Sequence, residues 1–234
     1  MMKQKLVMIG NGMAGLRTIE EILERLDSQF DITIIGKEPY PNYNRIMLSN
    51  ILQKKMTLED IIMNSYKWYE EHDIMLITDD PVQKVDRDNK VLTTSKGVTV
   101  DYDICIFATG SKAFVLPIKG FDFPSVIGWR TIDDTNKMIE IAKTKKHAVV
   151  IGGGLLGLEC ARGLLDQGME VTVLHLADWL MEMQLDHKAG EMLKADLEKQ
   201  GMKIELQANS KEIIGDEDVE AIKLADGRVI ETDL

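Results

Sequence analysis

The chain repeats one order of apolar and periodic segments in its two halves. In the first half, an apolar run at 5–10 leads into a glycine-rich turn, and residues 16–26 then place apolar side chains at helical spacing. A second apolar run, rich in isoleucine, follows at 31–36. Residues 146–176 repeat this order of strand, glycine turn, helix and strand. The two copies predict two nucleotide-binding sites.

The segments outside the repeats predict further helices and strands. We expect a helix running into a strand at 57–78, an antiparallel excursion at 82–94 and a return strand at 97–110. After the second repeat, 185–206 predicts another helix entering a strand, and 220–233 predicts a hairpin around an Asp-Gly pair. These segments extend each repeat towards a complete α/β domain.

Turn residues mark a crossover between the two repeats. The crossover contains Pro117, Gly120 and Pro124. A chain of 234 residues is long enough for two small domains. We therefore predict an α/β chain of two Rossmann-like dinucleotide-binding domains, with residues 1–116 in the first and 117–234 in the second.

Composition narrows the classes of function. A net charge of -11 argues against a protein that binds nucleic-acid phosphates through clustered Lys and Arg. No apolar run approaches the ~18 residues that are needed to cross a bilayer. The basic start leads into the apolar run at 5–10, which predicts a buried strand and not a signal peptide. Cys105 and Cys160 form no CxxC or CxxxxC pair, so we expect structural thiols in a reducing cytoplasm and no metal site.

The first glycine turn has the spacing of a dinucleotide fingerprint. Gly10 permits a tight turn, Gly12 allows close approach of a pyrophosphate, and Gly15 lets helix and strand pack closely. Met13 and Ala14 complete the start of the helix, where unpaired N–H groups favour negative charge. The segment therefore predicts a site for the FAD phosphates.

An acidic residue at the end of the second strand can accept hydrogen bonds from ribose hydroxyls. Glu38 follows that strand and fits this role, and the alternative is an ordinary charged loop residue. We take Glu38 as a candidate ribose ligand of FAD.

The second fingerprint has the same glycine spacing in front of a helix and would accept a pyrophosphate in the same way, so it predicts the NADH or NADPH site. Gly152, Gly154 and Gly157 supply the glycine spacing, and Leu155 and Leu156 begin the helix behind it.

The second fingerprint departs from the usual pattern at one position, because His175 stands where an acidic residue would bind the 2'-hydroxyl of NADH. A nearby Arg would instead favour the 2'-phosphate of NADPH. Residues 175–186 hold no Arg or Lys and include Asp178, which favours NADH without deciding the question. His175 could also be a half-buried surface histidine.

The two fingerprints, with Ala-Thr-Gly-Ser at 108–111 between them, resemble the FAD- and NAD(P)H-binding family of the glutathione reductase type. Within this family, 10–15, 41–49, 152–165 and 175–186 resemble the large subunits of assimilatory NAD(P)H-dependent nitrite reductases. This similarity runs along essentially the whole chain.

The resemblance implies further neighbours of FAD. It places Ala108, Thr109 and Gly110 in a turn that closes over the flavin nucleotide. It places Arg45 and Ser49 near the flavin pyrophosphate, where a cation and a hydroxyl would oppose phosphate charge. Arg45 could instead be a surface arginine.

Three more positions follow from the resemblance alone. Val82 matches a backbone contact to adenine, Arg130 matches a position close to FAD, and Glu159 matches a carboxylate beside the nicotinamide. Arg130 could instead pair with a nearby aspartate, and Glu159 could be a solvated helix residue. Asn50 stands where ferredoxin reductases of the family often carry a Lys close to the flavin ring.

The cysteine content excludes two branches of the family that the sequence resembles. A disulfide reductase of this family needs a CxxxxC pair, and the peroxidase and oxidase branch needs a thiol near 43–49; this sequence has neither. Electrons would then leave the flavin for a one-electron carrier. In nitrite reductases they pass to an iron-sulfur centre and sirohaem, whose cysteine clusters this sequence lacks.

The chain ends where the family continues with a strand returning to the FAD domain. We therefore expect a truncated fragment that binds FAD weakly or not at all and is inactive by itself, with an exposed apolar edge on the first domain.

The leading hypothesis is a module that passes electrons from NADH or NADPH through FAD towards reduction of nitrite to ammonium. A reductase of rubredoxin or ferredoxin, and a nucleotide-binding fragment without turnover, stay as alternatives. Expected partners are the nicotinamide dinucleotide and downstream acceptor domains or a small redox protein, with a homodimer also possible.

Overall fold

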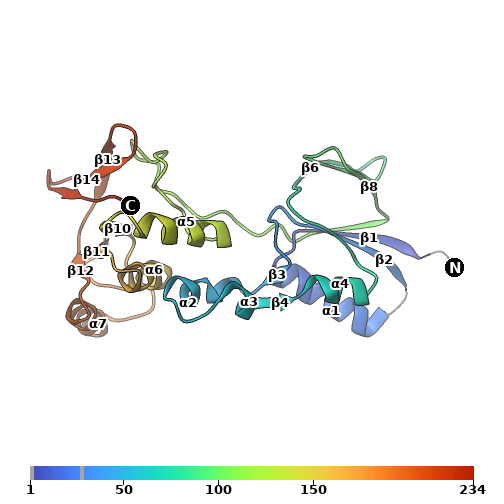
Figure 1. Cartoon of the computed structure of the whole chain (residues 1–234), viewed down its shortest axis with the longest axis horizontal. Helices are drawn as coiled ribbons and strands as arrows, with labels where there is room; N and C mark the ends of the chain where they lie inside the picture. Colours follow the sequence, from blue (N-terminus) through green and yellow to red (C-terminus); the bar gives the residue numbers. More distant parts are fainter. Residues whose placement is uncertain (1–2, 27–28) are drawn as a thin grey trace. The chain divides into compact units, whose positions relative to one another are not determined.

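The computed structural model describes residues 3–26 and 29–234 and divides the chain into two compact units (Figure 1). The first unit comprises Met1–Arg45 and Leu58–Ser111, and the second comprises Ile46–Thr57 and Lys112–Leu234.

The predicted division between residues 116 and 117 differs from these units in two segments. Residues 46–57 and 112–116 fall in the second unit and not in the first. Residues 1–2 and 27–28 of the predicted first domain lie outside the described part of the chain. As a boundary between two nucleotide-binding domains, the division stays a prediction.

A parallel sheet forms the centre of the first unit. Its strand order is β5-β2-β1-β9, and every neighbouring pair is parallel. The bounds are β1 (Gln4–Ile9), β2 (Phe30–Ile35), β5 (Met75–Ile77) and β9 (Ile104–Phe107). Because the strands are parallel, the turns that follow them meet at one edge of the sheet.

The two faces of β1 pack against different layers, as the alternation of side chains along a strand requires. Leu6 and Met8 lie in one core cluster with α1 (Met13–Leu26) and α4 (Tyr66–Glu71), whereas Val7 and Ile9 lie in another with the antiparallel sheet β6-β7-β8. Figure 1 shows the two helices and the three strands on opposite sides of the parallel sheet. The bounds are β6 (Val82–Asp86), β7 (Val91–Thr94) and β8 (Thr99–Asp101).

The predicted continuous helix within 57–78 is wrong. The segment contains α3 (Leu58–Ile61) and α4, separated by β4 (Ile62–Asn64). The short strand β4 pairs antiparallel with β3 (Asn42–Tyr43), and Asn44 N–H donates to the Ile61 carbonyl. This pairing between distant segments outweighs the local helical periodicity.

The second unit is built on the parallel sheet β10-β11-β12. The bounds are β10 (His147–Ile151), β11 (Glu170–Leu174) and β12 (Lys203–Glu205). Helix α6 (Leu155–Asp166) packs with α2 (Leu48–Leu52) and α5 (Ile132–Ala142), and α7 (His187–Lys199) precedes β12. The short 3-10 helix η1 (Arg45–Met47) leads into α2.

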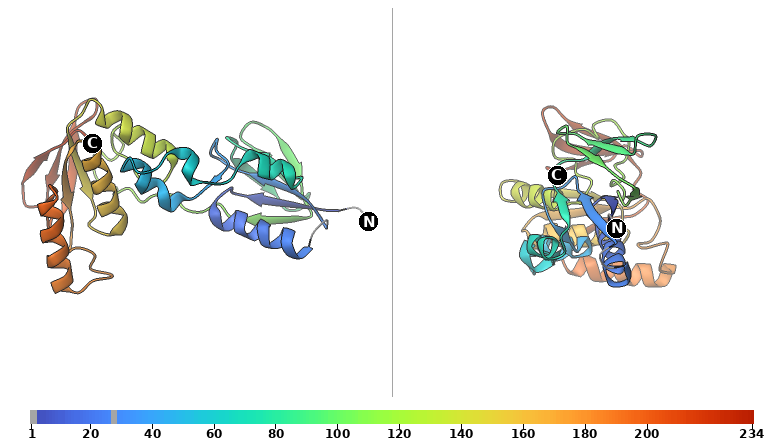
Figure 2. Two further views of the ribbon diagram at one scale, coloured as in Figure 1. Left: turned by 60° about the horizontal axis from the view of Figure 1, so that its bottom comes forward. Right: turned by 90° about the vertical axis from the view of Figure 1, so that its right-hand side faces the viewer.

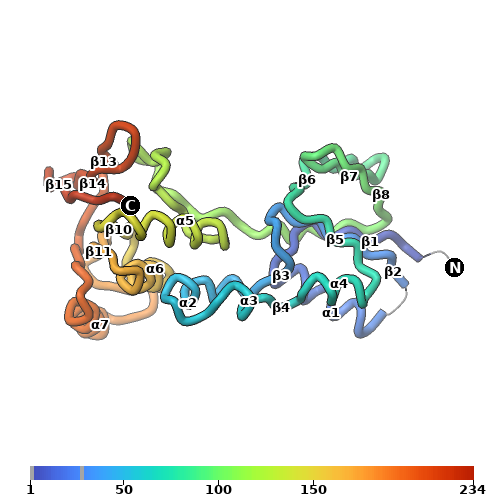
Figure 3. Tube along the Cα trace, in the orientation of Figure 1, coloured from blue at the N-terminus to red at the C-terminus, as the bar shows by residue number. Residues whose placement is uncertain are grey.

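A small antiparallel sheet, β13-β14-β15, completes this unit. Its strands are β13 (Ser210–Gly215), β14 (Val219–Leu224) and β15 (Val229–Glu231). All three are labelled on the Cα trace in Figure 3. Side chains of β13 and β14 form a core cluster with Leu174, whereas α6 packs in the cluster on the other face of the parallel sheet (Figure 2). The predicted hairpin at 220–233 is confirmed, but β13 was not predicted.

Both units thus have parallel sheets with helices, and the predicted α/β class is confirmed. Within residues 3–26 and 29–234, no helix has the length and apolar character needed to span a membrane.

Candidate functional site

The first glycine turn lies at the carboxyl end of β1, beside the turn that follows β9. Gly10 has a φ of 114°, and a Cβ there would lie 2.2 Å from the Ala108 carbonyl oxygen. A Cβ on Gly15 would lie 2.9 Å from the Ala108 Cβ, whereas a Cβ on Gly12 would meet nothing within 4 Å. Packing therefore requires the outer two glycines, and the middle one faces open space.

Helix α1 begins at Met13, directly behind this open space. The N–H groups of Met13, Ala14 and Gly15 belong to the first turn, where helices lack internal acceptors, and this first turn has no acidic residue. Backbone donors, a helix N-terminus and unfilled space fit a pyrophosphate. The glycines and helix-start residues that sequence reasoning placed here are therefore brought together around the open space at Gly12.

A hydrogen-bond network that the sequence did not reveal holds this turn. The hydroxyl of buried Tyr69 donates to Asn11 Oδ1 at 2.8 Å and accepts from the Asn42 N–H at 3.2 Å. Burial raises the pKa of Tyr69 to about 12, so the hydroxyl keeps its proton. Asn42 Nδ2 also donates to the Asn11 carbonyl at 3.2 Å. Tyr69 and Asn42 are distant in sequence, which is why no local pattern marked them.

Glu38 and Arg45 are brought into contact with each other. Arg45 Nη2 lies 2.8 Å from Glu38 Oε1, and the Tyr43 hydroxyl donates to Glu38 Oε2 at 2.7 Å. The Arg45 guanidinium also lies 4.9 Å from the centre of the Tyr43 ring. Each carboxylate oxygen can accept a further hydrogen bond, so this arrangement fits a ribose ligand. The sequence indicated both residues but not their pairing.

The remaining candidate FAD residues lie in different surroundings. Thr109 is exposed and Gly110 has a φ of 68° in the turn after β9, while Val82 begins β6 and packs against the cluster under β1. Ser49 is buried on α2 in the second unit, and its hydroxyl donates to the Ile46 carbonyl at 3.3 Å. The predicted contacts of these residues with FAD stay predictions.

The second glycine turn follows β10, and like the first it has a first glycine with positive φ and a middle glycine that faces open space. Gly152 has a φ of 121°, and a Cβ on Gly157 would lie 1.9 Å from the Gly152 carbonyl oxygen. Gly154 is the N-cap of α6, and a Cβ on it would meet nothing within 4 Å. Leu155 and Leu156, in the first turn of α6, are 58% and 67% exposed. This turn likewise fits a pyrophosphate.

His175 is buried at the carboxyl end of β11, with 6% of its surface exposed. Its Nδ1 accepts the Gly153 N–H at 3.0 Å, so that nitrogen carries no proton and the ring is the neutral Nε2–H tautomer. His175 therefore positions the glycine turn, and it is not the half-buried surface histidine that was one alternative. The sequence marked the position but not this contact.

A cavity of 570 Å³ in the second unit adjoins the second glycine turn. Arg130, Leu156 and Cys160 are among its lining residues. Arg130 N–H donates to Asp134 Oδ2 at 2.9 Å, and burial raises the pKa of the Cys160 thiol to about 12. Glu159 is half-buried on α6. The roles of Arg130 and Glu159 at the cofactors stay predictions.

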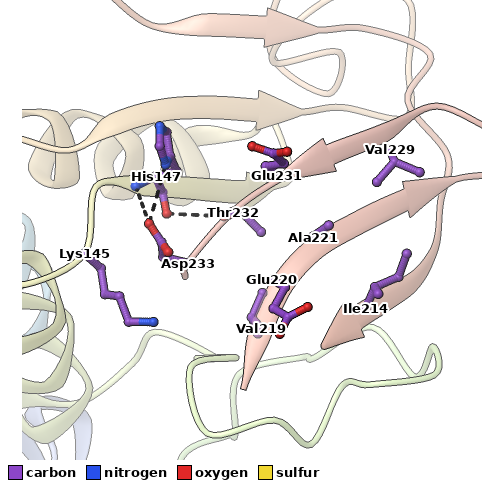
Figure 4. A pocket seen from close by; sticks show the side chains of 10 residues that line it. All are labelled: Lys145, His147, Ile214, Val219, Glu220, Ala221, Val229, Glu231, Thr232 and Asp233. Carbon is purple, nitrogen blue, oxygen red and sulfur yellow. Dashed lines mark hydrogen bonds and ion pairs between the residues drawn. The ribbon is translucent and has the colours of Figure 1, made fainter. Parts of the chain in front are cut away.

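A second hollow of 460 Å³ lies at the opposite end of β10 (Figure 4). Asp233 Oδ2 accepts the N–H groups of Lys146 and His147 at 3.0 and 2.9 Å, and the lining also includes Lys145 and Glu231. These hydrogen bonds fasten the end of the chain to β10. The lining mixes acidic and basic groups and indicates no particular ligand.

Comparison with known proteins gives a consistent result. A family model described as pyridine nucleotide-disulphide oxidoreductase matches residues 4–234. The chain is 52% identical to the nitrite reductase [NAD(P)H] of Bacillus subtilis over 232 residues, covering 99% of this chain and 29% of that protein. It is 44% identical to the assimilatory nitrate reductase electron transfer subunit of the same organism, covering 100% of this chain and 30% of that protein.

Among solved structures, a ferredoxin reductase from Rhodopseudomonas palustris matches with a TM-score of 0.90 and 26% identity, covering 99% of this chain and 57% of that one. The chain thus spans less than a third of the length of the two curated relatives and over half of the solved structure.

Proposed function

This chain belongs to the pyridine nucleotide-disulphide oxidoreductase family, and on that basis we propose that its first unit binds FAD and its second binds NADH or NADPH. The observation that carries the proposal is the repeated open glycine, at Gly12 and again at Gly154, in front of a helix N-terminus. A pyrophosphate can approach the backbone only where a Cβ is missing and nothing else fills the space.

We propose that the whole reaction carries electrons from a nicotinamide coenzyme to FAD. When both cofactors are bound, the nicotinamide supplies a hydride and the flavin accepts it. The chain's own residues bind and orient: the two helix N-termini hold the pyrophosphates, and Glu38 with Arg45 and Tyr43 holds the adenosine ribose of FAD. No protein nucleophile is needed for hydride transfer.

We further propose that the electrons serve reduction of nitrite to ammonium, through iron-sulfur and sirohaem groups outside this chain. The identity of 52% with a nitrite reductase and of 44% with a nitrate reductase electron transfer subunit supports this acceptor. Free Cys105 and Cys160 agree with a cytoplasmic location. A homodimer stays a prediction.

The test is anaerobic reduction of the FAD-loaded protein, expressed from its whole open reading frame, by NADH or NADPH. Bleaching of the flavin followed by nitrite-dependent reoxidation is the expected result. Bleaching without a response to nitrite would overturn the nitrite assignment and keep the electron-input role. No bleaching with either coenzyme would leave a nucleotide-binding protein without turnover.

The second candidate is reduction of a small ferredoxin or rubredoxin. The likeness to a ferredoxin reductase over 99% of this chain favours it. Reoxidation of the bleached flavin by an added ferredoxin, faster than by nitrite, would select this acceptor.

A further inference from the structure

The second unit lacks the acidic residue that usually ends the second strand of a dinucleotide fold, because His175 occupies that position. A carboxylate nevertheless lies there. Glu182 Oε2 is 3.0 Å from His175 Nε2. We propose that Glu182 supplies the carboxylate that accepts the 2'-hydroxyl of the adenosine ribose, so that the second unit selects NADH over NADPH. The inference rests on the proposed function of this unit.

The loop that carries Glu182 is fastened to the glycine turn on both sides of Gly153. Gly153 N–H donates to His175 Nδ1 at 3.0 Å, and Met181 N–H donates to the Gly153 carbonyl at 3.1 Å. A Cβ on Gly153 would lie 2.5 Å from Leu180 Cδ2 and 2.8 Å from His175 Cγ, so the loop packs directly on the turn. Glu182 follows Met181 and is therefore held beside the pyrophosphate site.

The side chains of His175 and Glu182 are complementary at this point. The Nε2–H of His175 is buried, and it has no aligned acceptor within the described residues. The Glu182 side chain is 35% exposed, so the carboxylate can face a ligand while it stays next to that donor. His175 thus positions the glycine turn through Nδ1 and places the polar Nε2–H beside Glu182, and Glu182 is the group that would touch the ribose.

Charge around the loop disfavours a 2'-phosphate. Residues 175–186 contain no Arg or Lys. On the neighbouring hairpin, Arg228 is held by Glu205 at 2.6 Å and Asp226 at 2.8 Å. A 2'-phosphate beside Glu182 would therefore meet a negative charge with no opposing cation in this loop.

Calorimetric titration of the chain with NAD⁺ and with NADP⁺ tests the inference without requiring FAD. We expect the unchanged chain to bind NAD⁺ about 10-fold or more tightly than NADP⁺, since a hydrogen bond to a charged acceptor is replaced by repulsion. Glu182→Gln should reduce this ratio about 10-fold. Glu191→Gln is the matched control, because it makes the same change from acid to amide at an exposed residue of α7, outside this loop, and it should leave the ratio within about 2-fold.

The outcomes separate the inference from the proposed function. Binding of neither coenzyme by the unchanged chain would overturn the function of the second unit and the inference with it. Equal binding of both, or a ratio that stays unchanged in Glu182→Gln, would overturn the role of Glu182 alone. Glu182→Asp, which keeps the charge one methylene further back, should give an intermediate ratio and guards against a folding defect in Glu182→Gln.

Discussion

At the scale of single residues, the glycines of each turn divide into those that folding needs and those that a ligand needs. A Cβ on Gly10 or Gly157 would lie 2.2 or 1.9 Å from a backbone oxygen, whereas Gly12 and Gly154 face open space. The sequence assigns these roles by position in the fingerprint, but a pattern of glycines does not say which neighbour each one meets. The pattern was enough to locate both turns.

The pair Gly157→Ala and Gly154→Ala should separate these two roles. The methyl group of Gly157→Ala would force the Gly152 carbonyl aside, and we expect a loss of about 1–3 kcal/mol in the free energy of unfolding. Gly154→Ala should stay within about 1 kcal/mol of the unchanged chain, because the site is open and the φ of -83° suits alanine. Its affinity for NAD⁺ should nevertheless fall about 10-fold or more as the methyl meets the pyrophosphate.

Urea denaturation and calorimetric titration of both variants measure the two effects. Equal stability of the two variants would contradict the division of the glycines. Unchanged NAD⁺ affinity in Gly154→Ala would contradict the placement of the pyrophosphate.

His175 offers a second test at this scale, because its two nitrogens have different neighbours. In His175→Asn, the side-chain oxygen can replace Nδ1 as acceptor of the Gly153 N–H, but nothing replaces Nε2 beside Glu182. We expect His175→Asn to keep most of the stability and to lower the preference for NAD⁺ over NADP⁺. His175→Ala should lose both, with the free energy of unfolding reduced by about 1–3 kcal/mol for the unsatisfied Gly153 N–H.

Thermal melts and coenzyme titrations of the two variants provide the comparison. If His175→Asn were as unstable as His175→Ala, the acceptor role of Nδ1 would be wrong. If it kept the full coenzyme preference, Glu182 would not depend on His175.

At the scale of elements, the sequence predicts those strands and helices whose partners are local. The βαβ units and the 220–233 hairpin follow from periodicity and turn residues. In contrast, β4 exists because it pairs with β3, and β13 because it pairs with β14. The break in 57–78 therefore has no local signal, since the contact that causes it lies about 20 residues away along the chain.

Asp218, directly before β14, is hydrogen-bonded to a loop residue that is distant in sequence, and this contact makes stability depend on pH. Its carboxylate accepts the Ser125 N–H at 2.9 Å and the Ser125 hydroxyl at 2.6 Å, and it also accepts the Val219 N–H at 2.8 Å. Partial burial opposes ionisation, but these hydrogen bonds outweigh it and hold the pKa of Asp218 below its usual value. A depressed folded-state pKa stabilises the fold above the unfolded pKa of ~4 and loses that contribution as pH falls through the folded pKa.

Asp218→Asn should therefore lower the free energy of unfolding by about 1 kcal/mol at pH 7. The difference from the unchanged chain should start to shrink as pH falls below ~4, where the carboxylate of the unfolded chain takes up a proton, and should be lost once pH passes the lower folded-state pKa. Urea titrations at pH 7, 5 and 3.5 measure it. Glu217→Gln, an exposed neighbour, is the control, and a pH-independent difference for Asp218→Asn would contradict the role of the charge.

At the scale of the whole molecule, the sequence located both sites by their repeats but not the polar network around them. Glu38 and Arg45 were each assigned a separate cofactor contact, and the structure pairs them. Tyr69 reaches the first turn from α4, and Glu182 reaches the second from the loop that follows β11. Contacts of this kind depend on how distant segments pack, which spacing along the chain does not encode.

Because each unit carries its own glycine turn, the two dinucleotides should bind independently. In protein expressed from its whole open reading frame, Gly12→Ala should lower the affinity for FAD about 10-fold or more and leave the affinity for NAD⁺ unchanged, since the methyl fills only the space in the first unit. Gly154→Ala should do the reverse. Flavin fluorescence titration measures the first affinity and calorimetry with NAD⁺ measures the second.

In protein expressed from the whole open reading frame, either substitution should slow NADH-driven bleaching of the flavin at subsaturating cofactor. Loss of both affinities in one variant would mean that the two units do not bind their ligands separately, and an exchange of the two effects would reverse the assignment of FAD and NAD(P)H to the units.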